Sequence, residues 1–251
     1  MSVVVGAAGP PSRAVRAQTR VELLLTLRRG ESVLLTFLIP VLLLGFFSVV
    51  DVLPTGTDDP VTFLFPGVLA LAIMSTALVS VAIATGFERQ MGVLKRLGAT
   101  PLTRRQLVAA KTAAIAAIEV LQVVVLVVEG LALGFRFDGP QVAVALLAAV
   151  LATIAFAGLG LLMAGTLPAL TTLAAANGVY LVLLLVSGMV FPLDELPGPV
   201  ADVARLLPST ALAEVFGGAL GGAEVPARAL VILLVWAVAA PLAAARWFRW
   251  E

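Results

Sequence analysis

Six long apolar segments, separated by shorter polar stretches, dominate the chain. Each contains roughly twenty residues, which is long enough for a helix to cross a hydrocarbon core of about 30 Å. The segments are continuous and show little alternation of period two, and a backbone in lipid must satisfy its own hydrogen bonds. They are therefore predicted to be helices and not barrel strands. The six predicted transmembrane helices are Val33–Val50, Phe63–Thr85, Leu107–Leu133, Val142–Met163, Leu173–Phe191 and Ala229–Ala245.

The composition agrees with a membrane protein and restricts the chemistry open to the chain. Of its 251 residues, 61% are hydrophobic and 12% are charged, whereas a soluble domain carries about 25% charged residues. The chain has no Cys and no His, which excludes disulfides, thiol nucleophiles, zinc sites built on Cys or His, and triads that need an imidazole. Its net charge of +1 gives no reason to expect a nucleic-acid partner. No catalytic residue and no metal site are predicted.

The placement of basic residues predicts the orientation. Thirteen of the 16 Lys and Arg residues lie in the N-terminal stretch, around the loop between the second and third apolar segments, or in the C-terminal tail. The loops on the opposite side hold only Arg136, Arg205 and Arg228 and are rich in Asp and Glu. Because basic loops resist translocation, both termini are predicted to be cytoplasmic. The Ala, Val, Leu and Gly content is typical of a bacterial protein, so we expect a multi-pass protein of the bacterial inner (cytoplasmic) membrane.

The N-terminal stretch has a helical pattern of its own. Arg13, Arg16 and Arg20 share one helical face, and the following Val21–Leu27 is mostly apolar. Together they predict an interfacial helix whose basic face meets lipid headgroups. A disordered basic anchor is the alternative that the sequence leaves open.

The polar segment between the second and third apolar segments also has a helical pattern. Phe87, Met91, Leu94 and Leu97 follow helical spacing and would form one apolar stripe on a short cytoplasmic helix over Phe87–Leu97. Either lipid headgroups or a soluble protein could cover such a stripe, because amphipathicity does not identify the partner.

A turn and a new helix start are predicted directly after this stripe. Gly98 is a natural helix stop, and Pro101 favours an extended residue before it. Thr103 with Gln106 three residues later fits a capping box that opens the third transmembrane helix.

The same segment resembles a pattern found in permeases of the ABC type-2 exporter family, where Glu-Arg and Gly-x-Leu precede a Thr-Pro-Leu turn. Here the matching residues are Phe87-Glu88-Arg89-Gln90-Met91-Gly92-Val93-Leu94-Lys95-Arg96-Leu97, then Thr100-Pro101-Leu102 and the distal Lys111. The resemblance extends over nearly the whole chain, with a basic N-terminal helix, six spans and a long external segment between the last two. Gln90 departs from it, because relatives commonly have an acidic residue there. A related motif resembles the lipoprotein-exporter and cell-division permeases, but their large external domain has no counterpart here.

The resemblance implies that this segment is a coupling helix that docks on a separate nucleotide-binding subunit. The ATPase-coupling residues that it implies are Phe87, Glu88, Arg89, Met91, Leu94, Lys95, Arg96, Leu97, Thr100 and Pro101. It also implies a dimer with a second permease, the same or a related chain. Neither lysine follows a glycine, so the chain has no phosphate-binding loop. ATP and Mg are then expected on the partner ATPase, with no cofactor in this chain.

The resemblance implies a permease subunit of an ATP-driven exporter for a hydrophobic or amphipathic substrate, such as a drug, a lipid or a glycan. A proton-coupled secondary transporter that uses Glu119 is the alternative. An intramembrane enzyme is a poor third candidate, because the chain lacks His, Cys and a cluster of metal ligands.

Three polar residues inside the predicted spans are possible pathway residues. Glu119 lies about 18 Å along the helix axis from Leu107 and shares a helix face with Gln122. An ionisable group at that depth is costly and usually faces protein or a watery cavity. A structural hydrogen bond between helices is the interpretation that we favour for Glu119. Asn177 in the fifth span could line a pathway or join helices.

Two further helices are predicted in the external segment between the last two spans, over Val200–Leu207 and from Pro208 to about Leu220. Their apolar residues indicate that they do not stand free in water, and the resemblance implies short re-entrant helices in the outer leaflet.

The predicted architecture is an all-α polytopic membrane protein. It has six transmembrane helices, an N-terminal interfacial helix, a cytoplasmic coupling helix and short external re-entrant helices. Residues 1–32 form the cytoplasmic N-terminal segment, 33–248 the transmembrane domain and 249–251 a cytoplasmic tail. Within the transmembrane domain, 87–106 is the coupling loop and 192–228 the external re-entrant segment.

Overall fold

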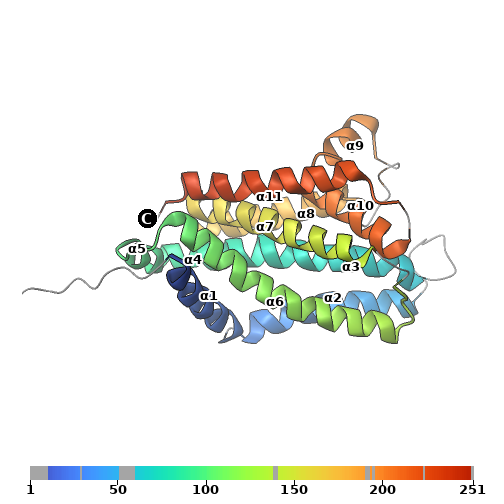
Figure 1. Cartoon of the computed structure of the whole chain (residues 1–251), viewed down its shortest axis with the longest axis horizontal. Helices are drawn as coiled ribbons and strands as arrows, with labels where there is room; N and C mark the ends of the chain where they lie inside the picture. The colour runs from blue at the N-terminus through green and yellow to red at the C-terminus, as the bar shows by residue number, and fades with distance from the viewer. Residues whose placement is uncertain are drawn as a thin grey trace, which may run out of the picture.

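The computed structural model describes residues 11–28, 30–50, 60–137, 141–189, 193, 196–222 and 224–249, and these residues form helices and turns but no strand. Among them, five helices are long and apolar enough to cross a membrane, or six if one bent pair counts as a single span. The long helices run along the same axis (Figure 1). The prediction of an all-helical, multi-pass membrane protein is therefore confirmed.

The helices follow the chain in a simple order. They are α1 (Pro11–Arg28), α2 (Gly30–Val49), α3 (Pro60–Met74), the π-helix η1 (Ser75–Ser80), α4 (Val81–Gln90), α5 (Val93–Gly98), α6 (Arg104–Ala132), α7 (Val142–Thr166), α8 (Ala169–Val186), α9 (Gly198–Ala204), α10 (Pro208–Gly221) and α11 (Ala227–Trp247). One continuous helix over Val61–Gln90 contains most of α3 and all of η1 and α4. Figure 1 places α1, α5 and the C-terminal end of the chain at one end of the molecule, with α9 and α10 toward the other.

Five of the six predicted spans coincide with the five long helices. The predicted first span falls on α2, whose described apolar part, Thr36–Val49, is shorter than the others. The predicted fifth span extends too far, because α8 ends at Val186. Gly188 has a φ of +81°, a left-handed backbone conformation that does not continue an α-helix.

The N-terminal helix forms as predicted, as one continuous element over Pro11–Arg28. It packs against α6 and crosses it obliquely (Figure 1). Arg13, Arg16 and Arg20 are exposed, and so are Leu24 and Leu27. The helix thus presents basic and apolar side chains together, which is the composition of a membrane-surface helix.

The prediction of one amphipathic helix over Phe87–Leu97 is wrong. The helix that carries Phe87 ends at Gln90, and Gly92 has a φ of +73°. A separate short helix, α5, then begins at Val93. Because a left-handed residue cannot lie inside a right-handed α-helix, the predicted stripe is divided between two elements. The capping box at Thr103 and Gln106 is confirmed, with both of its reciprocal hydrogen bonds present.

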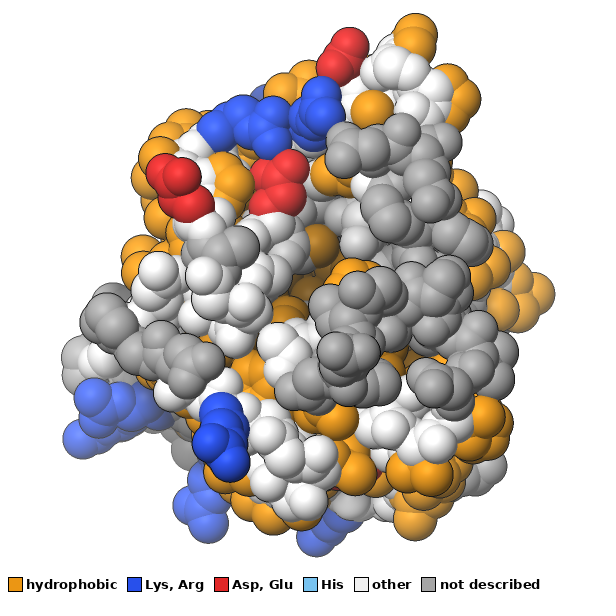
Figure 2. Space-filling view, turned by 90° about the vertical axis from the view of Figure 1, so that its right-hand side faces the viewer, with side chains coloured by type: hydrophobic (Ala, Val, Ile, Leu, Met, Phe, Trp, Pro, Cys, Tyr) orange, Lys and Arg blue, Asp and Glu red, His pale blue; other side chains and the backbone are white. Residues whose placement is uncertain are grey.

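In the external segment, α9 and α10 form the bent pair, with an angle of 83° between them. The first helix covers Gly198–Ala204 and not Val200–Leu207, because Leu207 is extended and Pro208 opens α10. Helix α10 packs against α3, α7 and α11, and its Leu212, Val215 and Phe216 are buried. Acidic and basic side chains lie side by side at this end of the molecule (Figure 2). Arg228 and Glu214 form an ion pair at 2.8 Å.

Some of the predicted features lie outside the described residues. These are residues 1–10 of the N-terminal segment, the acidic loop around Asp51, Asp58 and Asp59, parts of the 190–195 stretch, and residues 250–251 of the tail.

Helix α7 is the packing centre of the bundle. It contacts α4, η1, α6, α8, α10 and α11. Two of its glycines allow backbones to come very close: a Cβ on Gly158 would lie 2.6 Å from the nitrogen of Pro241, and one on Gly160 would lie 2.6 Å from the carbonyl oxygen of Leu78. Small residues at such crossings allow the close van der Waals packing on which helix association in lipid depends.

We expect Gly160→Ala to destabilise the protein by about 1–3 kcal/mol, because the added methyl group meets backbone that cannot rotate away. The midpoint of thermal unfolding in detergent should fall. Gly217→Ala in α10 is the matched control, because a Cβ there has nothing within 4 Å. Equal midpoints for the two variants would show that the α7 crossing tolerates a larger side chain.

Candidate functional site

The short helix α5 is fixed to the end of the bundle by a small apolar cluster. Leu94 is 0% exposed and packs with Leu107 and Phe248, and Leu97 and Leu102 lie against this group. Phe248 follows the last helix, so the cluster joins α5 to the adjacent ends of α6 and α11. The predicted stripe residue Leu94 therefore points into the protein, where it holds α5 in place.

Other residues of the predicted coupling segment face outward. Lys95, Arg96, Thr100 and Pro101 are exposed, and Met91, at the break before α5, is 62% exposed. Because Lys95 and Arg96 lie on a helix with a buried anchor, the structure presents two cations on a fixed projection at the end of the molecule.

Two residues near the end of α4 point inward. The guanidinium of Arg89 donates a hydrogen bond to the carbonyl oxygen of Ala164, at 2.8 Å, and ties α4 to the end of α7. Phe87 is half-buried, whereas Glu88 is 6% exposed. The ten predicted coupling residues thus separate into an inward-facing set and an outward-facing set.

Glu88 belongs to a buried ionic cluster with Glu22 and Lys111. The ammonium group of Lys111 lies 2.6 Å from a carboxylate oxygen of Glu88 and 2.8 Å from one of Glu22. The three residues are 5–7% exposed. Because they come from α1, α4 and α6, this ion cluster connects the N-terminal helix to the helix that leads into α5. Charges removed from water are costly, and here each carboxylate has the same cation within hydrogen-bond distance.

A cavity of about 590 Å³ lies beside this ion cluster. Its lining includes all three charged residues and the hydroxyl-bearing Thr26, Thr36, Thr76 and Ser80. The cavity thus borders α1, α2, η1, α4 and α6. A change in the position of α4 would alter the shape of this polar space.

Glu88 and Lys111 both belong to the motif that carries the resemblance, but their pairing is not predicted from the sequence, and neither is the part that Glu22 takes. A usable signal was present: a lone Lys inside a predicted apolar span requires a carboxylate partner. Which carboxylates supply it depends on how α1 folds back against α6, and no local pattern encodes that packing.

Glu119 and Gln122, one helix turn apart on α6, face different neighbours. The side-chain oxygen of Gln122 accepts from the Thr76 hydroxyl at 3.1 Å, and its amide nitrogen donates to the carbonyl oxygen of Thr36 at 2.8 Å. Gln122 therefore joins α6 to η1 and α2. Glu119 is 4% exposed and accepts a hydrogen bond from the Thr153 hydroxyl of α7. The structural hydrogen bond that we favoured for Glu119 is present.

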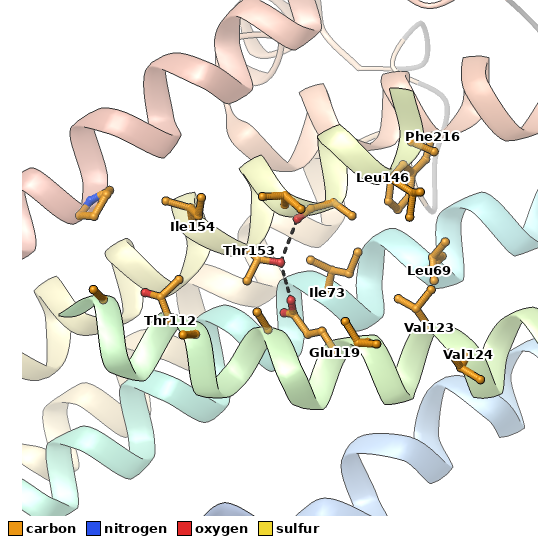
Figure 3. Close-up of a pocket in the computed structure, with 18 of the residues that line it drawn as sticks. Leu69, Ile73, Thr112, Glu119, Val123, Val124, Leu146, Thr153, Ile154 and Phe216 are labelled. Carbon is orange, nitrogen blue, oxygen red and sulfur yellow. Dashed lines mark hydrogen bonds between the residues drawn. The ribbon is translucent and has the colours of Figure 1, made fainter. Parts of the chain in front are cut away.

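Glu119 also lines a large cavity, with a volume of about 1130 Å³. Figure 3 shows this cavity between α6 and α7, with Leu69 and Ile73 of α3 and Phe216 of α10 on its other sides. Of the described residues that line it, only Glu119 and Arg105 have ionisable side chains. The cavity is otherwise almost entirely apolar and suits a hydrophobic molecule.

Asn177 does not line this cavity. Its side chain is exposed on α8 and donates to the carbonyl oxygen of Leu173, one turn earlier in the same helix, at 2.8 Å. The structure therefore brings Glu119 and Gln122 to the middle of the bundle and leaves Asn177 on an outer surface.

A bundle of long apolar helices with an anchored basic projection at one end and an apolar cavity within it suits a membrane transport subunit. The comparison with known families agrees: the model of the ABC-2 type transporter family matches residues 13–220. The chain belongs to this family, which forms the transmembrane, non-ATPase part of ABC transporters. No curated protein matches the chain in a sequence comparison.

We expect Lys111→Met to destabilise the folded protein by about 3–5 kcal/mol, because the buried carboxylates of Glu22 and Glu88 then lose their ion pairs with its ammonium group. The midpoint of thermal unfolding reports the loss. Arg104→Met, at an exposed position of the same helix, should have little effect. Adding Glu22→Gln and Glu88→Gln to Lys111→Met should recover part of the stability, and a failure to recover any would mean that charge is not the cause.

Proposed function

We propose that this chain is the permease subunit of an ATP-driven exporter. In this proposal it moves a hydrophobic or amphipathic substrate, such as a drug, a lipid or a glycan, outward by alternating access. A separate ATPase subunit binds ATP and Mg and supplies the energy. The observation that carries the proposal is the basic projection of α5, anchored by Leu94, in a chain of the ABC-2 family.

Both termini are assigned to the cytoplasm, and α5 then faces the ATPase. Exposed basic residues gather at the end of the molecule that holds α1 and α5, among them Arg16, Arg96 and Arg246. The opposite end carries ion pairs in which cations are matched by Glu214 and Asp202. The positive-inside rule supports a cytoplasmic location for the first end, and we propose the bacterial inner membrane as the membrane that the chain spans.

The predicted coupling residues take two different roles in this proposal. The outward-facing Met91, Lys95, Arg96, Thr100 and Pro101 contact the ATPase. The inward-facing residues carry the displacement of α5 into the membrane domain: Leu94 and Leu97 through the apolar cluster, and Arg89 through α7. Glu88 does so through Lys111 and α1. Phe87 lines the cavity beside this ion cluster.

The alternative, a proton-coupled secondary transporter that uses Glu119, differs in its energy source. Membership of the ABC-2 family supports ATP hydrolysis as the energy source. Transport that continues after deletion of the partner ATPase and follows the proton gradient would favour the alternative.

We expect the tagged chain, purified in mild detergent from its native membranes, to bring a stoichiometric P-loop ATPase with it. Arg96→Glu should reduce the yield of that ATPase at least tenfold, because reversing an interface charge removes an attraction and adds a repulsion. Membrane insertion should not change, since Arg96 is exposed. Quantitative gel staining of the purified complex measures the ratio.

Arg136→Glu is the control for this experiment, because it reverses an exposed charge near the other end of the molecule. Leu94→Asp should also release the ATPase, but it places a carboxylate in the apolar cluster and so tests the anchor as well as the contact. An unchanged ATPase ratio in Arg96→Glu would remove α5 as the docking element.

A second permease, the same or a related chain, is proposed to pack on the outer face of α8. Leu170, Leu181, Val182 and Leu185 are exposed on this helix, and Asn177 is exposed among them. A polar side chain that faces lipid in the middle of a span is costly, whereas in an interface it can hydrogen-bond to a partner.

We expect Asn177→Cys to form cross-linked dimers with a short thiol-reactive cross-linker in native membranes. The chain has no Cys of its own, so every cross-link reports on the introduced residue. Leu234→Cys, on an exposed position of α11, is the matched control and should remain monomeric. Equal cross-linking at the two sites would indicate random collision and not a dimer through α8.

A further inference from the structure

One buried oxygen atom in the large cavity is not satisfied by the protein. Glu119 is 4% exposed, and its Oε1 atom has no hydrogen-bond partner among the residues that the structure describes. A buried carboxyl oxygen without a donor costs free energy, so such an atom in a binding cavity indicates a ligand that supplies the donor.

The other carboxyl oxygen is only partly satisfied. Thr153 is within hydrogen-bond distance of two acceptors, Glu119 Oε2 and the carbonyl oxygen of Ala149, the latter at 2.8 Å (Figure 3). A hydroxyl group has a single proton to donate. Thr153 therefore provides Glu119 with at most one hydrogen bond, and shares that proton with the backbone of its own helix.

We propose that the cavity between α6 and α7 binds a lipophilic amine, whose ammonium group donates to Glu119 Oε1. The surrounding residues, such as Ile73, Val123, Leu146 and Phe216, contact the apolar body. A carboxyl group in an apolar cavity favours a cation that brings its own hydrogen-bond donor. An acyl chain or a deprotonated anion has no donor to offer and would leave Oε1 without a partner.

The size and the charges of the cavity fit such a ligand. Its volume of about 1130 Å³ is slightly above the usual range for pockets that bind drug-sized ligands, about 300–1,000 Å³, so the cavity has room for such a ligand. The other charged lining residue, Arg105, lies fourteen residues before Glu119 on α6, which is about 21 Å along the helix axis. At that distance Arg105 does not compete for the carboxyl group.

The cavity is also accessible from the side of the bundle. Several of its lining residues are among the exposed apolar side chains, including Val120 and Val124 of α6, Leu146 and Val150 of α7, and Leu242 of α11. A lipophilic amine dissolved in the bilayer can therefore enter between α6, α7 and α11 without passing through water. The export of the bound amine rests on the proposed permease function, whereas the binding of the amine does not.

Binding can be measured on the purified permease with dansylcadaverine, a lipophilic primary amine that carries a fluorophore. We expect saturable binding by fluorescence anisotropy, weakened about tenfold to a hundredfold by Glu119→Gln. Glu129→Gln, on the same helix but outside the cavity lining, should bind as the unmodified protein does. The N-acetylated probe, which keeps the fluorophore and loses the cation, should bind weakly to all three proteins.

A second pair of variants tests the cavity without changing the carboxyl group. Ala116 lines the cavity, whereas the next residue, Ala117, is exposed and does not. Ala116→Trp should abolish amine binding by filling the space, and Ala117→Trp should leave it unchanged. This pair of variants tests whether the amine binds in the cavity even if Glu119→Gln fails to fold.

Several results would overturn the inference: equal affinity of Glu119→Gln and Glu129→Gln, equal affinity for the acetylated probe, or no binding to folded protein. None of them bears on the ATPase contact, because binding is measured without the partner. Conversely, Arg96→Glu should lose the ATPase and keep amine binding, so a failure of the proposed function is distinguishable from a failure of this site.

Discussion

The lack of a strong hydrophobic drive between helices in lipid is the constraint on which this fold depends. Apolar side chains are already solvated by acyl chains, so the helices must associate through close packing and through polar contacts. Helix α7 supplies the close packing, because Gly158 and Gly160 bring it against the backbones around Pro241 and Leu78. The polar contacts lie around it: Gln122 joins α6 to η1 and α2, and Thr153 joins α7 to α6.

The end of the molecule that holds α5 combines two kinds of attachment. Leu94 fixes α5 through an apolar cluster with Leu107 and Phe248, and the ion cluster of Glu22, Glu88 and Lys111 fixes α4 to α1 and α6. A buried ion cluster adds less to stability than its short distances suggest, because the desolvation of its charges offsets much of the attraction. The ion cluster nevertheless restricts how α4 can move. The end of α4 can move only together with α1 and α6 or by separating charges, which suits an element that transmits displacement.

The polar side chains of the long helices have different surroundings, although they look alike in sequence. Gln122 has its hydrogen-bonding groups satisfied by Thr76 and Thr36 and is a structural residue. Glu119 shares the hydroxyl proton of Thr153 with the backbone and keeps one oxygen without a donor, so it can still bind a ligand. Asn177 bonds only within its own helix and faces outward. The degree to which neighbouring helices satisfy each group distinguishes the packing contact of Gln122 from the binding role proposed for Glu119 and the interface role proposed for Asn177.

The sequence by itself determined the helical class, most of the spans and the start of α6. Spans are encoded by length and hydropathy, and the capping box at Thr103 by residues close in the chain. Tertiary structure decided the rest. The sequence did not place the break at Gly92, because the stripe through Met91 and Leu94 fits a continuous helix equally well. Nor did it pair Lys111 with Glu22, or Glu119 with Thr153, because these contacts join residues 89 and 34 positions apart. Such pairs depend on how whole helices pack, which a local pattern does not record.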